Sequence, residues 1–161
     1  MAFSLSPGSR LPEISLTDSR GHSTPVAPGE TLLAIFKTTC PTCAFAWPYL
    51  ERIRTLARGG RLSVLAVSQD EPRTTEAFYA ELGVSLPTAY DPEPWPASAA
   101  LSLTTVPTFL LVGADRTLRD TAVGFQKHKM EAFAAEAARL AGRPAPGLFS
   151  PGERVPAIKP G

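Results

Sequence analysis

Two cysteines, Cys40 and Cys43, are the residues of this sequence whose type and spacing favour chemistry. A cysteine sulfur reacts as its thiolate, and two thiols at this spacing can form and break a disulfide with each other. Because the chain has no other cysteine, the pair cannot belong to a disulfide framework that holds a small fold together. A bridge across one helical turn also closes too short a loop to stabilise the chain much. The pair therefore predicts thiol–disulfide exchange.

The segment around the pair predicts a strand, a turn and a helix. Residues 32–36 form a short continuous apolar run, which is typical of a strand buried on both faces. From residue 41 to residue 58, apolar side chains recur at helical spacing until two glycines end the pattern. Cys40 would then lie at the start of the helix, where unpaired N–H groups and the helix dipole favour an anion. We expect Cys40 to attack a substrate disulfide and Cys43, the more buried partner, to resolve the mixed disulfide.

The remaining pattern predicts an α/β fold in one domain. A buried strand at 62–67 and a helix at 74–82 repeat the first unit, so parallel pairing is expected. Later segments indicate a short helix at 97–103, a hairpin of 108–112 with 117–124, and a final amphipathic helix at 127–140. We interpret residues 1–142 as the domain and the proline-rich residues 143–161 as an extended tail.

Composition and charge limit the classes of partner and the cellular location that we expect. The formal net charge is +1, which indicates neither a nucleic-acid surface nor a surface for acidic ligands. The apolar runs are far shorter than the roughly 18 residues of a membrane-spanning helix. The first ten residues lack a basic start followed by an apolar run, so we expect a cytoplasmic protein. We also expect a monomer. An extracytoplasmic location is the alternative if a leader has been removed.

Three motifs make the chain resemble the thioredoxin superfamily, in particular its TlpA/ResA-like or redoxin branch. The segment 35–43 resembles the active-site element, Pro48 matches a helix-kinking proline, and residues 106–110 match the motif that contains a cis-proline. The resemblance implies a thioredoxin-like fold, with a central mixed sheet of four or five strands and helices on both faces. It also implies that Pro107 is cis and faces the cysteine pair, and that the backbone of Val106 contacts an extended substrate.

The same resemblance implies a protein-disulfide reductase or thiol–disulfide oxidoreductase that needs no cofactor or metal. Its partners would be a disulfide-bearing protein and an unidentified electron donor or acceptor. Besides Val106 and Pro107, we expect four residues near the cysteines to contact the substrate, namely Thr39, Pro41, Thr42 and Trp47. The chain departs from thioredoxin itself, which has an aromatic residue at the position of Thr39 and Gly-Pro between its cysteines.

The two cysteines could also belong to three other kinds of functional site. A thiol peroxidase of the peroxiredoxin type needs a hydroxyl three residues before its reactive cysteine, where this chain has Lys37. A structural zinc site needs two further ligands, for which only the isolated His22 and His128 are spare. Two thiolates could also hold Cu(I) in a redox or metal-delivery module, but no methionine or histidine cluster accompanies them.

Overall fold

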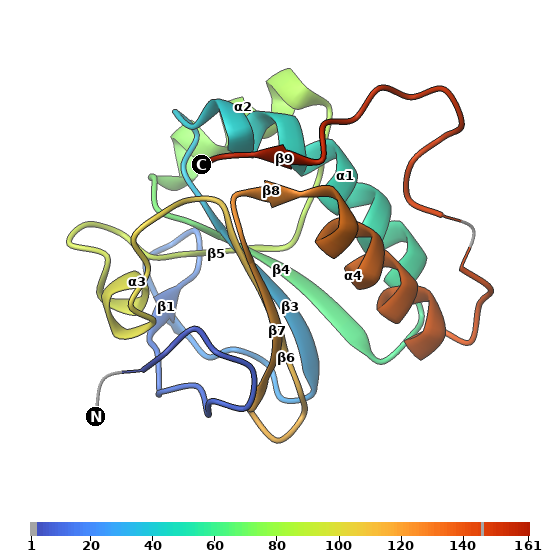
Figure 1. Ribbon diagram of the computed structural model, residues 1–161. Helices are drawn as coiled ribbons and strands as arrows, with labels where there is room; N and C mark the ends of the chain where they lie inside the picture. The colour runs from blue at the N-terminus through green and yellow to red at the C-terminus, as the bar shows by residue number, and fades with distance from the viewer. Residues whose placement is uncertain (1–2, 146) are drawn as a thin grey trace.

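The computed structural model describes residues 3–145 and 147–161 (Figure 1). Seven strands of this part form the main sheet, in the order β2-β1-β5-β4-β3-β6-β7. At its centre β3 (Glu30–Phe36) pairs in parallel with β4 (Leu62–Ser68) and antiparallel with β6 (Thr108–Val112). The sheet continues through β7 (Leu118–Val123), antiparallel to β6, and through β5 (Thr88–Tyr90), parallel to β4. This mixed sheet confirms the predicted thioredoxin-like α/β fold.

Two apolar clusters cover the two faces of the sheet. Residues 32–36 of β3 are at most 1% exposed, as expected for a strand buried on both faces. One cluster joins the sheet to α1 (Pro41–Ala57), α2 (Pro72–Leu82) and α4 (Lys127–Leu140). The other joins it to the N-terminal segment and to α3 (Pro96–Ala100). Helices therefore lie on both faces, as predicted, and α1 and α4 pack side by side (Figure 1).

The predicted number of four or five strands was wrong. The sequence analysis missed β1 (Leu16–Thr17), β2 (Ser23–Thr24) and β5. These strands have only two or three residues, which is too short to show a period of two. They extend one edge of the sheet, because β1 pairs antiparallel with both β2 and β5.

The segment after α4 contains bends and turns and has a short strand close to its end. After α4 the chain returns along the molecule, and β9 (Ile158–Lys159) pairs antiparallel with β8 (Phe125–Gln126) (Figure 1). Before that strand, Leu148 is only 5% exposed, and the ring of Phe149 lies 5.0 Å from that of Tyr49 in α1. The tail thus packs against the elements that carry the cysteines. In the described residues no helix is long and apolar enough to cross a membrane.

Candidate functional site

The two cysteines lie at the junction of β3 and α1. β3 ends at Phe36, and α1 begins at Pro41, a residue suited to the first helical position because its missing N–H needs no partner. Cys40 is the N-cap of α1, and its Sγ accepts a hydrogen bond from the backbone nitrogen of Cys43 at 3.2 Å. Both cysteines are free thiols, so the structure describes the dithiol form.

The two thiols differ in their access to solvent. Cys40 is partly exposed, whereas Cys43 is completely buried. Burial raises the pKa of the Cys43 thiol well above its ordinary value, and its hydrogen bond with the Cys40 side chain adds to this shift. Cys43 therefore stays protonated at neutral pH. An accessible thiol at Cys40 can attack a substrate, while the thiol of Cys43 is shielded from solvent.

The loop before β6 lies next to the sulfur of Cys40, on the other side of the site from α1. The peptide bond between Val106 and Pro107 is cis, which confirms the expectation from the resemblance. The Sγ of Cys40 donates a hydrogen bond to the carbonyl oxygen of Val106 at 3.5 Å. Pro107 itself is buried. Segments that are more than sixty residues apart in the sequence thus meet at the sulfur of Cys40.

The site has a supporting carboxylate that sequence reasoning did not assign. Asp70 follows the end of β4, and its Oδ2 accepts a hydrogen bond from the backbone nitrogen of Thr38 at 2.7 Å. Its own backbone nitrogen donates to the hydroxyl of Ser68 at 3.1 Å. These bonds hold the turn before Cys40 against the neighbouring parallel strand. The only available signal was an acidic residue at the end of that strand.

A hollow lies beside Val106 on the side of α3. It has a volume of about 330 Å³, and Lys37, Gln69 and Trp95 contribute to its lining. The Nζ of Lys37 lies 4.2 Å from the centre of the Trp95 ring, at cation–π distance. The Trp95 indole donates to the backbone oxygen of Gln69 at 3.1 Å. This hollow borders the cysteine site without containing either sulfur.

The predicted contact residues fall into two groups. Thr39 and Pro41 are exposed beside Cys40, where a substrate could touch them. Thr42 is only 5% exposed, and its hydroxyl donates to the carbonyl oxygen of Pro160 at 2.5 Å. The tail therefore covers Thr42.

The prediction that Trp47 contacts substrate was wrong. Trp47 is completely buried. Its ring lies 4.4 Å from that of Phe36 and 6.1 Å from that of Phe109. Position 47 lies on the face of α1 that packs on the sheet, so this side chain belongs to the core.

The histidines lie away from the cysteines. His22 is exposed and lies 3.6 Å from the Asp18 carboxylate in a surface turn, and His128 is exposed in the first turn of α4. In residues 3–145 and 147–161 no three side chains of His, Cys, Asp or Glu form a group suited to a metal ion. The ligand set that tetrahedral zinc would need is not assembled in this part of the chain.

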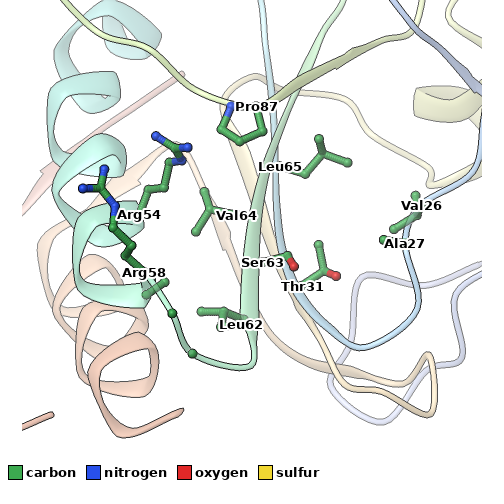
Figure 2. A pocket seen from close by; sticks show the side chains of 13 residues that line it. Val26, Ala27, Thr31, Arg54, Arg58, Leu62, Ser63, Val64, Leu65 and Pro87 are labelled. Carbon is green, nitrogen blue, oxygen red and sulfur yellow. The ribbon is translucent and has the colours of Figure 1, made fainter. Parts of the chain in front are cut away.

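Another hollow of about 330 Å³ lies at the opposite end of the parallel strands (Figure 2). It is formed by the last turn of α1, the start of β4 and the segment before β3. Its charged side chains are Arg54 and Arg58, and it contains no cysteine, histidine or carboxylate. It is therefore separate from the thiol chemistry.

Comparison with known proteins places the chain in a family and identifies its fold. A family model described as Redoxin matches residues 6–138. A comparison with curated proteins gave no match.

Solved structures with the same fold are distant in sequence. A candidate protein disulfide isomerase from Bacteroides thetaiotaomicron has a TM-score of 0.73 and 15% identity, over 89% of this chain and 96% of that chain. A candidate thiol:disulfide interchange protein DsbE from Chlorobium tepidum has a TM-score of 0.71 and 20% identity, over 84% and 99% of the two chains. A secreted Mycobacterium tuberculosis disulfide oxidoreductase has a TM-score of 0.62 and 13% identity, over 77% and 96%.

Proposed function

The chain belongs to the Redoxin family, and from this premise we propose that it is a thiol–disulfide oxidoreductase in which Cys40 is the nucleophile and Cys43 the resolving thiol. The observation that carries the proposal is the position of the Cys40 sulfur. It is partly exposed and lies between the Cys43 amide at 3.2 Å and the Val106 carbonyl at 3.5 Å. The similarity of the fold to disulfide oxidoreductases agrees with this assignment.

The exchange proceeds in two steps. The thiolate of Cys40 attacks one sulfur of a substrate disulfide, forms a mixed disulfide, and releases the other substrate sulfur as a thiolate that takes up a proton. Cys43 then loses its proton and attacks the sulfur of Cys40, which releases the second substrate thiolate. Two electrons pass to the substrate, and a disulfide between Cys40 and Cys43 remains. A dithiol donor must reduce it before the next turnover, and the reverse sequence oxidises a substrate.

Two backbone segments would position the substrate. We assign this role to Val106 and Pro107, because the Val106 carbonyl oxygen already contacts the attacking sulfur. Thr39 and Pro41 border the same sulfur and are exposed. Their exposure supports contacts with a protein substrate rather than with an enclosed small molecule.

The partners and the compartment belong to the same proposal. We expect a disulfide-bearing protein and a separate electron donor or acceptor, with the chain acting as a monomer. A cytoplasmic location would favour reduction of substrates, since the cytosolic glutathione pool is reducing. One relative in fold is a secreted protein, which keeps an oxidising compartment as the alternative. Fractionation of the native cells with an antibody against the chain decides between them.

Insulin-disulfide reduction with dithiothreitol as the donor tests the assignment. We expect the native chain to accelerate precipitation of the insulin B chain at least tenfold over dithiothreitol alone. Cys40→Ser should abolish the acceleration, because no nucleophile remains. Reduced Cys43→Ser, mixed with insulin after dithiothreitol has been removed, should accumulate a mixed disulfide that mass spectrometry detects, because the resolving thiol is missing. A native chain without activity, or a mixed disulfide formed equally by both variants, would disprove the assigned roles.

A further inference from the structure

The end of the tail lies on the cysteine site. The hydroxyl of Thr42, between the two cysteines, donates to the carbonyl oxygen of Pro160 at 2.5 Å. The next residue, Gly161, lies directly against the Val106 carbonyl and the methyl group of Thr105. The same Val106 carbonyl accepts the hydrogen bond from the Cys40 sulfur. One carbonyl group is therefore in contact with both the reactive sulfur and the tail.

The backbone of the tail is held as an added strand. Its β9 pairs with β8, and the carbonyl oxygen of Ala157 accepts a hydrogen bond from the Lys127 amide at 2.8 Å. A Cβ atom added to Gly124 would lie 3.0 Å from the carbonyl oxygen of Lys159. A glycine at this position therefore lets the tail pass close to the loop after β7.

The hydrogen bonds at the end of the tail come from its backbone, and the Lys159 ammonium also lies 5.8 Å from the centre of the Phe45 ring. Ala157 and Pro160 contribute carbonyl oxygens, and the side chain of Ile158 points outward and is 65% exposed. Strand addition of this kind accepts many sequences, because main-chain hydrogen bonds supply most of the attraction. The surface next to Cys40 thus binds an extended polypeptide, and here that polypeptide is part of the same chain.

We propose that residues 157–161 occupy the surface formed by β8, Thr42 and Val106 on which an extended protein substrate would lie, so that the tail competes with the substrate for access to Cys40. This inference rests on the proposed oxidoreductase function and adds two points, the pairing of the extended substrate along β8 and its competition with the tail. The tethered tail has a high effective concentration, so a free substrate must displace it. A small disulfide needs only the exposed part of the Cys40 sulfur.

Removal of residues 157–161 tests the competition. This truncation keeps the contacts of Leu148, Phe149 and Glu153 with α1. We expect the truncated chain to reduce insulin at least threefold faster than the full chain, and bis(2-hydroxyethyl) disulfide at a rate within twofold of it. The free peptide Val-Pro-Ala-Ile-Lys-Pro-Gly should inhibit the truncated chain in competition with insulin. Equal or lower insulin rates after truncation would overturn the proposal while leaving the oxidoreductase function intact.

A matched pair of proline substitutions detaches the strand without shortening the chain. The register of β8 with β9 and the bond to Ala157 place the backbone N–H of residue 159 toward β8 and that of residue 158 away from it. Lys159→Pro removes the inward N–H together with the ammonium contact to Phe45, and should raise the insulin rate toward that of the truncated chain. Lys159→Ala removes only the ammonium contact and should leave the rate within twofold of the native chain. Ile158→Pro should leave the rate within twofold of the native chain.

The outcomes separate the two proposals. Equal effects of the two proline substitutions would contradict the competition by the tail. A full chain and a truncated chain that both fail to react with either disulfide would instead refute the oxidoreductase function, and the competition with it.

Discussion

The sulfur atom of Cys40 accepts a hydrogen bond from the backbone nitrogen of Cys43 at 3.2 Å. The residue assigned as the nucleophile is thus also the N-cap of α1. The first amides of a helix have no partner within it, so a side-chain acceptor at this position stabilises the helix. The chemistry and the stability of the dithiol form therefore depend on the same atom.

Substitution of Cys40 should separate its capping role from its chemistry. Cys40→Ser keeps an acceptor for the Cys43 amide, whereas Cys40→Ala removes it. We expect the alanine variant to be less stable than the serine variant by about 1 kcal/mol, while both lack exchange activity. Urea unfolding of the reduced variants at pH 7 measures the difference. Equal stabilities would show that the sulfur does not cap the helix.

The buried thiol of Cys43 should make the stability of the reduced protein depend on pH. Burial raises the pKa of Cys43 in the folded chain, and its reference value is 9.0. Above that value the unfolded chain releases the proton while the folded chain keeps it, so the free energy of unfolding falls as pH rises. We expect a loss of about 1.4 kcal/mol by pH 10 relative to pH 7.

The control for this pH effect is Cys43→Ser, which retains Cys40 and every tyrosine. Denaturant unfolding of both reduced proteins between pH 7 and pH 10 gives the comparison. The loss attributed to Cys43 should be missing from the variant. Parallel pH profiles of the two proteins would contradict the assignment.

Asp70 should hold the turn that precedes Cys40. Its carboxylate accepts the Thr38 amide at 2.7 Å, and Asp70→Ala leaves that partly buried N–H without its partner. We expect a loss of about 2 kcal/mol in the free energy of unfolding. Asp70→Asn keeps a carbonyl oxygen and should lose about half as much. Hydrogen exchange at the Thr38 amide should become at least tenfold faster in the alanine variant, and unchanged exchange there would exclude this role.

Asp91 should contribute more than Asp70 to the free energy of unfolding. Its carboxylate is completely buried and accepts hydrogen bonds from the backbone nitrogens of Ala97 and Ser98 at 2.9 and 2.8 Å, and from the Ser98 hydroxyl at 2.6 Å. Asp91→Ala leaves these donors unpaired and should cost about 3 kcal/mol. Ser98→Ala keeps both backbone donors to Asp91. It removes the hydroxyl, which also accepts a hydrogen bond from Gln69 Nε2 at 2.8 Å, and should cost about 1 kcal/mol. Thermal or urea unfolding ranks the two variants, and a reversed order would contradict the contacts.

The elements that position the cysteines could be predicted from the sequence because their signals are local. The apolar run of β3 and the helical spacing of α1 lie within single windows, and glycines mark where α1 and α2 end. The strands β1, β2 and β5 have two or three residues each, so no repeating sequence pattern signals them. Pairing with neighbouring strands of the sheet stabilises them.

The parts of the site that could not be predicted depend on contacts between a side chain and a distant backbone group. Asp70 binds the amide of Thr38, and Thr42 binds the carbonyl of Pro160. Every residue has a backbone amide or carbonyl, so nothing in the partner's identity signals such a contact. Trp47 was misassigned for a related reason. Its proximity in sequence to Cys43 did not reveal which face of α1 it occupies.

The anchor of the tail should control how often its end leaves the cysteine site. Glu153 accepts hydrogen bonds from the Arg52 guanidinium at 2.9 and 3.1 Å and from the Ser150 amide at 3.0 Å. These contacts, the Arg52 bond foremost, lower the pKa of Glu153 from 4.5 to about 2. The ion pair of Glu153 with Arg52 is thus fully present above pH 4.5, and it is lost as pH falls toward 2 because the carboxylate becomes protonated. Between pH 5 and pH 8 it should hold the tail in place.

Glu153→Ala should loosen the tail without shortening it. We expect the Lys127 amide, which donates to Ala157, to exchange with solvent at least threefold faster at pH 7, because β9 detaches more often. The insulin rate should rise toward that of the chain truncated after Pro156. Arg154→Ala is the matched control, because its exposed side chain makes no ion pair with the residues that the structure describes. If Glu153→Ala and Arg154→Ala gave the same exchange at Lys127, the ion pair with Arg52 would not anchor the tail.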